Sequence, residues 1–297
     1  MADFKTSSSA LAAGAIVVNA FIWGVSWWPL KSLQNSGLHP LWATAAVYML
    51  VSVGMLIFYR QSGRALLANP HLWFLALASG LTNVGFNWAV TVGDVVRVVL
   101  LFYMMPAWSV LVAWILLGEK PTRGSLLRLA LAMAGVLIVL KTPESPWPVP
   151  QSGVDWLALM GGLSFAITNA LLVKYNGSPS SGRMLAMFAG GALLSTGVSL
   201  LGLLLGVLPQ PALQAAGIPV FFGLCLAFII SNAALQYGAA RLVASTTALL
   251  MLTEILFASV SAALLGAAEF SPRIFWGGGL IVLAALLAAL THHNEHH

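Results

Sequence analysis

The sequence predicts an all-helical integral membrane protein of ten transmembrane helices, arranged as two inverted five-helix repeats. Three observations predict this fold. Of the 297 residues, 60% are apolar and only 7% are charged, whereas about a quarter of the residues of a soluble domain are charged. Long apolar runs recur between turn signals, and two motifs recur at a nearly constant spacing. The surface of such a protein faces lipid.

Each apolar run is long enough to cross a hydrocarbon core of about 30 Å. Segments such as NSGLHP, GEKPTRGS and YNGSPSSG separate the runs, and Gly93 and Gly238 mark two shorter turns. Without those two turns, the merged helices would be too long for one crossing. The expected spans are 10–30, 41–59, 71–92, 95–117, 125–141, 153–173, 183–206, 216–237, 243–266 and 274–290.

The two halves are joined by a proline-rich linker. We expect the first repeat at 1–141, the linker at 142–152 and the second repeat at 153–297. NWAVTVG, which begins at Asn87, matches NAALQYG, which begins at Asn232, at a shift of 145 residues. PAWSVLVAWILLG, from Pro106, matches EILFASVSAALLG, from Glu254, at a shift of 148. Five crossings in each half would turn the second repeat upside down in the bilayer, as in many secondary transporters.

Charge predicts the orientation and excludes several partners. With a cytoplasmic N-terminus, the inner segments carry nine Lys and Arg residues and the outer segments four, so both termini are expected in the cytoplasm of a bacterial inner membrane. Although the net charge is +5, the basic residues are scattered singly, so no nucleic-acid partner is expected. The single Cys225 cannot form an intrachain disulfide.

The motifs that mark common enzymes are missing from the sequence. It contains no GxxxxGK[ST], HExxH or GxSxG pattern, so neither direct ATP use nor a familiar hydrolase site is predicted. We expect no enzyme activity, no cofactor and no metal site. The histidines at the C-terminus are interpreted as a tail rather than as metal ligands.

Polar side chains lie inside several of the expected spans. Asn83 and Asn87 share one face of the third helix, and Asn232 and Gln236 share one face of the eighth. An amide in hydrocarbon needs a partner. These amides therefore either join helices or line a polar cavity that could bind a zwitterionic solute. Trp23 and Trp27 are four residues apart in the first helix, either in an interfacial aromatic belt or on a cavity wall.

Glu254 is the most informative single residue. It lies about halfway along the ninth expected span, with no other charge within a dozen residues. An ionisable group inside the membrane suggests a functional site. Its carboxyl could bind a proton, attract a substrate ammonium group, or form a structural hydrogen bond to a neighbouring helix.

Together these features resemble the drug/metabolite transporter superfamily, in its ten-helix branch with paired EamA domains. The resemblance rests on PAWSVLVAWILLGEK in the fourth span, with Pro106, Gly118 and Glu119, and on FAITNALLVKY in the sixth. GDVVRVVLLFYMMP looks closest to the YddG-type aromatic amino acid exporters. The second half departs from the family pattern, because Glu254 stands where a proline is usual.

The resemblance implies a central cavity formed by helices one, three, four, six, eight and nine, with helices five and ten outside it. It implies an exporter of small metabolites, aromatic or other apolar amino acids first. The inverted repeats indicate alternating access, and we expect a monomer. The alternatives are a broad multidrug or nucleobase effluxer, a channel, or a membrane-embedded enzyme. The residues expected to bind substrate are Trp23, Trp27, Asn83, Asn87, Tyr103, Met105, Phe165, Asn169, Asn232, Gln236 and Glu254.

The predicted topology can be checked with reporter fusions after Gly177 and after Ser145. Six expected crossings separate Gly177 from the cytoplasmic N-terminus, and five separate Ser145 from it. We therefore expect the first reporter to be active in the cytoplasm and the second in the periplasm. Two reporters on the same side would contradict the inverted architecture.

Overall fold

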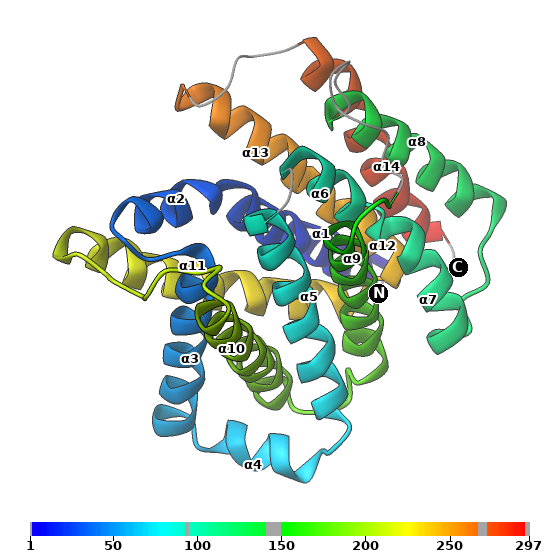
Figure 1. Ribbon diagram of the computed structural model, residues 1–297. Coiled ribbons are helices and arrows are strands. Elements are labelled where there is room, and N and C mark those ends of the chain that lie inside the picture. The colour runs from blue at the N-terminus through cyan, green and yellow to red at the C-terminus, as the bar shows by residue number, and fades with distance from the viewer. Residues whose placement is uncertain (1, 93–94, 141–149, 267–271, 295–297) are drawn as a thin grey trace.

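The computed structural model describes residues 2–92, 95–140, 150–266 and 272–294. Within these ranges every regular element is a helix (Figure 1). Gly93, Ser145 with most of the linker, and the last three residues of the His-rich tail lie outside them. The elements are α1 (Ala2–Val25), α2 (Trp27–Asn35), α3 (Pro40–Phe58), α4 (Gln61–Ala68), α5 (Leu72–Val92), α6 (Val95–Phe102), α7 (Met105–Leu117), α8 (Arg123–Leu140), α9 (Gly153–Lys174), α10 (Ser180–Leu204), the short 3-10 helix η1 (Ala215–Gly217), α11 (Ile218–Ala239), α12 (Ala244–Met251), α13 (Thr253–Leu264) and α14 (Pro272–Asn294).

In the described ranges, eight helical segments are long and apolar enough to cross a membrane. Side chains such as Phe58 and Leu204, 88% and 84% exposed, are suited to contact lipid tails rather than water. The protein is therefore a multi-pass membrane protein. The third expected span coincides with α5, which qualifies only together with α4 across a bend of 106°. The tenth lies on α14, whose described apolar part, Pro272–Ala288, is shorter than the rest, so the count of ten stays a prediction.

Three of the expected spans are divided into two helices. Proline accounts for two of the breaks, because its ring clashes with the carbonyl four residues earlier. Pro29 lies four residues after the end of α1 at Val25, and Pro106 lies four residues after the end of α6 at Phe102. The third break, at Leu252 between α12 and α13, has no proline. There the Thr253 hydroxyl donates to the Leu250 carbonyl at 2.7 Å, which offers the backbone a local alternative to continuous helix.

The helices pack in a layered bundle in which α9 and α10 contact α5, while α1 contacts α11 and α13. The α8–α14 pair lies to one side of the bundle, away from α3, α4 and α10 (Figure 1). Glycines stand where backbones approach most closely. A Cβ on Gly80 of α5 would lie 2.5 Å from the Gly190 carbonyl oxygen of α10, and a Cβ on Gly190 would overlap the carbonyl of Ala76.

The α5–α10 contact yields a test of this packing. Gly190→Ala inserts a methyl group against the backbone of Ala76, and overpacking of this kind costs about 1–3 kcal/mol. We expect a lower melting temperature of the detergent-solubilised protein.

The matched control is Gly197→Ala on the same helix, where an added Cβ meets nothing within 4 Å. It should keep or slightly raise the melting temperature, since alanine favours helix over glycine by ~1 kcal/mol. Equal melting temperatures for the two variants would refute the close contact.

Candidate functional site

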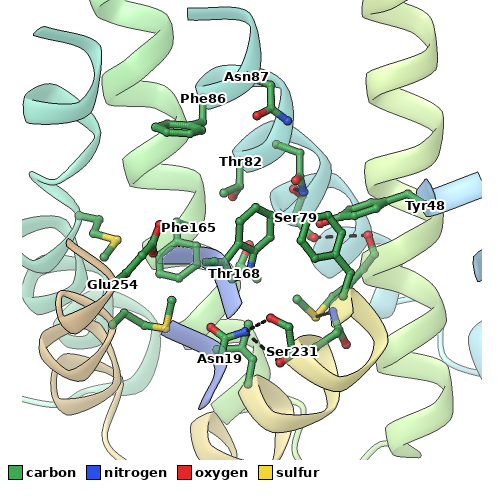
Figure 2. Close-up of a pocket in the computed structure, with 18 of the residues that line it drawn as sticks. Asn19, Tyr48, Ser79, Thr82, Phe86, Asn87, Phe165, Thr168, Ser231 and Glu254 are labelled. Carbon is green, nitrogen blue, oxygen red and sulfur yellow. Dashed lines mark hydrogen bonds between the residues drawn. The ribbon is translucent and has the colours of Figure 1, made fainter. Parts of the chain in front are cut away.

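A cavity of about 90 Å³ lies among the helices of the two halves. A cavity of only about 10–15 Å³ can hold one water molecule, so this space can hold several waters or part of a small solute. Polar and aromatic side chains share its wall (Figure 2). Twenty residues line it: Asn19, Trp23, Tyr48, Ser79, Thr82, Asn83, Phe86, Asn87, Phe102, Met105, Phe165, Thr168, Met187, Phe188, Phe228, Ser231, Asn232, Leu235, Met251 and Glu254.

Hydrogen bonds hold the amides of the wall, those of Asn19 and Asn87 between helices and that of Asn83 within α5. Asn19 of α1 donates through Nδ2 to the carbonyl of Ser231 on α11 at 2.9 Å and to its hydroxyl at 2.6 Å (Figure 2). Asn87 of α5 donates to the Thr44 hydroxyl of α3 at 3.1 Å. Asn83 donates to the carbonyl of Ser79 at 2.9 Å. These bonds satisfy polar groups that hydrocarbon could not, and they fix the orientation of the wall.

Aromatic rings form two groups around the space. Trp23 stacks on Phe228 with ring centroids 4.7 Å apart, and Tyr48 meets Phe228 edge-on at 5.8 Å. On the opposite side, Phe86 and Phe165 each contact Phe102, with centroids 4.7 and 6.3 Å apart. Figure 2 shows Tyr48 on one side of the space and Phe165, near Glu254, on the other. A planar apolar group could stack against either set.

Glu254 is the one carboxyl among the twenty lining residues, and no lysine, arginine or histidine is among them. It lies in the first turn of α13, directly after the break at Leu252. The hydroxyl of Tyr103, which lies in the break between α6 and α7, donates a hydrogen bond to its carboxyl. A Cβ on Gly24 of α1 would lie 2.7 Å from the Glu254 carbonyl oxygen, so α1 packs directly on this turn. The Tyr103 hydroxyl thus holds the carboxyl, and α1 packs on the backbone of the turn that carries it.

Seven of the eleven residues predicted from the sequence lie on the cavity wall. Tyr103 lies behind it, bound to Glu254. Gln236 is buried, and its side-chain amide meets the Oδ1 of Asn232 at 2.7 Å. Asn169 is fully buried, and neither atom of its amide has a hydrogen-bond partner in the described part of the chain. The seven are Trp23, Asn83, Asn87, Met105, Phe165, Asn232 and Glu254.

Trp27, also expected to bind substrate, lies away from the cavity. Its indole N–H donates to the Ser261 hydroxyl of α13 at 2.9 Å. The prediction assumed one continuous helix, in which Trp23 and Trp27 share a face. The break at Ser26 falls between them, so the shared face is lost and Trp27 instead ties α2 to α13.

Sequence reasoning missed several polar residues of the wall, namely Asn19, Tyr48, Ser79, Thr82, Thr168 and Ser231. A helical pattern could have found some of them. Ser79 lies four residues before Asn83, and Asn19 lies four before Trp23, so each shares a face with a residue that was recognised. Tyr48 had no such neighbour among the predicted residues.

A second pocket of about 250 Å³ opens between the α7–α8 loop and the start of α12. Glu119 and Arg128 lie at this pocket, half-buried, and burial raises the pKa of Glu119 above its ordinary value. Glu119 Oε2 and Arg128 Nε have no hydrogen-bond partner in the described residues. The lining residues are Val110, Ala113, Glu119, Lys120, Pro121, Thr122, Ser125, Arg128, Val243, Ser245 and Thr246. Helices α7 and α12 thus contribute to both the cavity and this pocket.

Comparison with known proteins adds three similarities. Residues 10–141 match the EamA-like transporter family. Over 164 residues the chain is 29% identical to Protein RarD from Streptomyces exfoliatus, a match that takes in 52% of this chain and 49% of that protein. The matched region thus spans about half the length of this curated relative. A protein of known crystal structure has the same fold, with a TM-score of 0.77 at 16% identity over 96% of this chain and 98% of the other.

Proposed function

We propose that the protein is a secondary transporter of the drug/metabolite transporter superfamily that exports small amphipathic metabolites through the central cavity. The observation that carries the proposal is the cavity wall, which combines aromatic rings, hydrogen-bonded amides and one carboxyl inside a membrane-embedded bundle. Such concave sites, mostly apolar with a few convergent polar groups, are typical of small-molecule binding. The match of residues 10–141 to a transporter family supports the same reading.

Alternating access between two inverted repeats is part of this proposal. Helix packing supports it. If the two halves are exchanged, α1 corresponds to α9, α11 to α5 and α13 to α7. Accordingly, α1 contacts α11 and α13, and α9 contacts α5 and α7. The helix breaks correspond as well. Met104 precedes α7 and Leu252 precedes α13, at the shift of 148 residues that aligns Pro106 with Glu254. Discontinuous helices at corresponding positions of two repeats commonly surround a substrate site.

Aromatic or other apolar amino acids are the substrates that suit the cavity best. A ring can stack against Phe86, Phe102 and Phe165, while Glu254 can pair with the ammonium group. The amides of Asn83 and Asn232 can donate to the carboxylate. We place the protein as a monomer in a bacterial inner membrane, with both termini in the cytoplasm.

A broad effluxer of organic cations is the second candidate. It is favoured by one observation: the lining residues include a carboxyl but no basic side chain that could balance a substrate carboxylate. An aromatic amine without a carboxylate would meet the same rings and the same Glu254.

Counterflow in proteoliposomes tests both candidates. We expect radiolabelled phenylalanine and tryptophan to accumulate faster than threonine, because threonine leaves the aromatic wall without a ring to stack on. Phenethylamine, which lacks the carboxylate, should compete poorly with phenylalanine.

Empty liposomes are the control, and equal accumulation in them would refute transport of these amino acids. Competition by phenethylamine at least as strong as by unlabelled phenylalanine would favour the organic-cation effluxer.

Glu254→Gln separates the three roles of the carboxyl. If the carboxylate pairs with the substrate ammonium group, the apparent affinity for phenylalanine should fall about tenfold or more, since hydrogen bonds to charged groups contribute ~1.5–3 kcal/mol. Tyr103→Phe, which removes only the donor to Glu254, should have a smaller effect in the same direction. Tyr237→Phe on α11, outside the cavity, is the matched control.

A flux that keeps its downhill rate and affinity in Glu254→Gln, but no longer responds to an imposed pH gradient, would instead assign Glu254 to proton coupling. Unchanged affinity and unchanged pH response would leave the structural hydrogen bond as its role.

A further inference from the structure

We propose that solute passes between the central cavity and the second pocket along the seam where α7 packs on α12, with Ser109 and Thr247 as a polar constriction on that path. This inference rests on the proposed transport function. It assigns a role to the second pocket, as one mouth of the path. It also names two residues that line neither space.

The α7 side of the seam follows from helical spacing. Met105 lines the central cavity and Ala113 lines the second pocket. Ser109 is four residues from each of them, so all three lie on one face of the helix. Ser109 is fully buried. The face that packs on α9 is a different one, formed by Trp108, Val112 and Leu116.

The α12 side has the same arrangement in the opposite chain direction. Met251 lines the central cavity, and Val243, which precedes α12, lines the second pocket. Thr247 lies four residues from each and is fully buried. Since α7 and α12 contact each other, the two stripes connect the same two spaces, with one hydroxyl on each stripe midway between them.

Both hydroxyls are buried without a hydrogen-bond partner, a state that they share with the hydroxyls of Ser52, Ser195 and Ser199. Neither the Ser109 Oγ nor the Thr247 Oγ1 has a hydrogen-bond partner in the described part of the chain. Two other buried threonines, Thr44 and Thr168, donate to the carbonyl four residues earlier, at 2.9 Å. An unsatisfied buried hydroxyl calls for an explanation. A path that closes here leaves the hydroxyls without partners, and one that opens provides them with water or a polar solute.

The ends of the seam suit a movable constriction. Met105 and Met251 stand at the cavity end, and methionine is unbranched and flexible, so it can change shape at low cost. Thr246 and Ser245 continue the polar lining at the other end. A hydroxyl both donates and accepts hydrogen bonds, which suits the passage of a zwitterionic or neutral polar solute.

The first test removes each hydroxyl without changing the shape much. Ser109→Ala and Thr247→Val should each lower the initial rate of phenylalanine counterflow about tenfold, the loss of one hydrogen bond to the passing solute. Ser195→Ala and Ser199→Ala are the matched controls, because their hydroxyls are equally buried and without partners but lie on α10, which packs mainly on α5 and α3 rather than at the α7–α12 seam.

Comparable rates for the two pairs of variants, measured beside an active wild type, would overturn the path while leaving the transport function intact. A wild type no faster than empty liposomes would instead contradict the proposed function.

The second test does not depend on flux. Cys225 is the single cysteine of the chain, so Cys225→Ala provides a cysteine-free background for Thr247→Cys. With phenylalanine present, a membrane-impermeant methanethiosulfonate reagent should label Thr247→Cys from the side of the second pocket. Ser199→Cys in the same background should stay unlabelled. No labelling of Thr247→Cys from either side of the membrane would overturn the proposal.

Discussion

The structure depends on one constraint, that a helix can be broken inside a bilayer only where protein rather than lipid surrounds the break. The chain places three such breaks within its bundle, at Ser26, before Met105 and at Leu252. Local hydrogen bonds satisfy the freed groups, for example from the Ser26 hydroxyl to the Trp23 carbonyl at 2.7 Å. The broken helices supply part of the cavity wall, including Glu254, and the unbroken helices α3, α5, α9, α10 and α11 supply most of it.

Two of the breaks carry side chains that meet. Tyr103 lies in the break between α6 and α7, and Glu254 lies in the first turn after the break at Leu252. The Tyr103 hydroxyl donates to the Glu254 carboxyl, so the contact joins the two halves of the sequence. The glycine contacts then hold this arrangement. Gly24 brings the α1 backbone against Glu254, and Gly85 and Gly161 bring α5 against α9.

The sequence predicts the positions of the helices better than it predicts their breaks and the contacts between them. Apolar runs and turn residues locate the spans, since transfer from water to lipid depends on local composition. Proline predicts two of the breaks by its own chemistry, as at Pro106. The break at Leu252 has no such marker. Its position depends on the groups that surround it in the folded protein. The hydrogen bond between Tyr103 and Glu254 joins residues 151 positions apart, so it too depends on the tertiary structure.

The difference between local pattern and tertiary packing also explains which residues of the cavity wall could be predicted. A residue four positions from a predicted amide, such as Ser79 from Asn83, lies on the same helix face, so its place on the wall can be predicted from the sequence. Trp27 lies away from the cavity, bonded to Ser261, because the break at Ser26 interrupts the helical period between Trp23 and Trp27. Nothing in the neighbouring sequence indicates which helix a given face packs against, and Tyr48 and Ser231 were therefore not predicted.

The electrostatics of the cavity follow from its composition. An ionised carboxyl at mid-membrane costs at least ~2.5 kcal/mol on insertion scales, and the lining of this cavity contains one carboxyl and no basic residue. The Tyr103 hydroxyl and the N-terminal end of α13 offset part of that cost, because both direct positive charge density toward the carboxyl. The remainder can be offset only by a proton or by a cationic group of the solute. A solute with a net negative charge would therefore be repelled at Glu254. Under the proposed function, a zwitterion would direct its ammonium group there and leave its carboxylate to the wall amides, so the single carboxyl would fix the orientation of the bound solute.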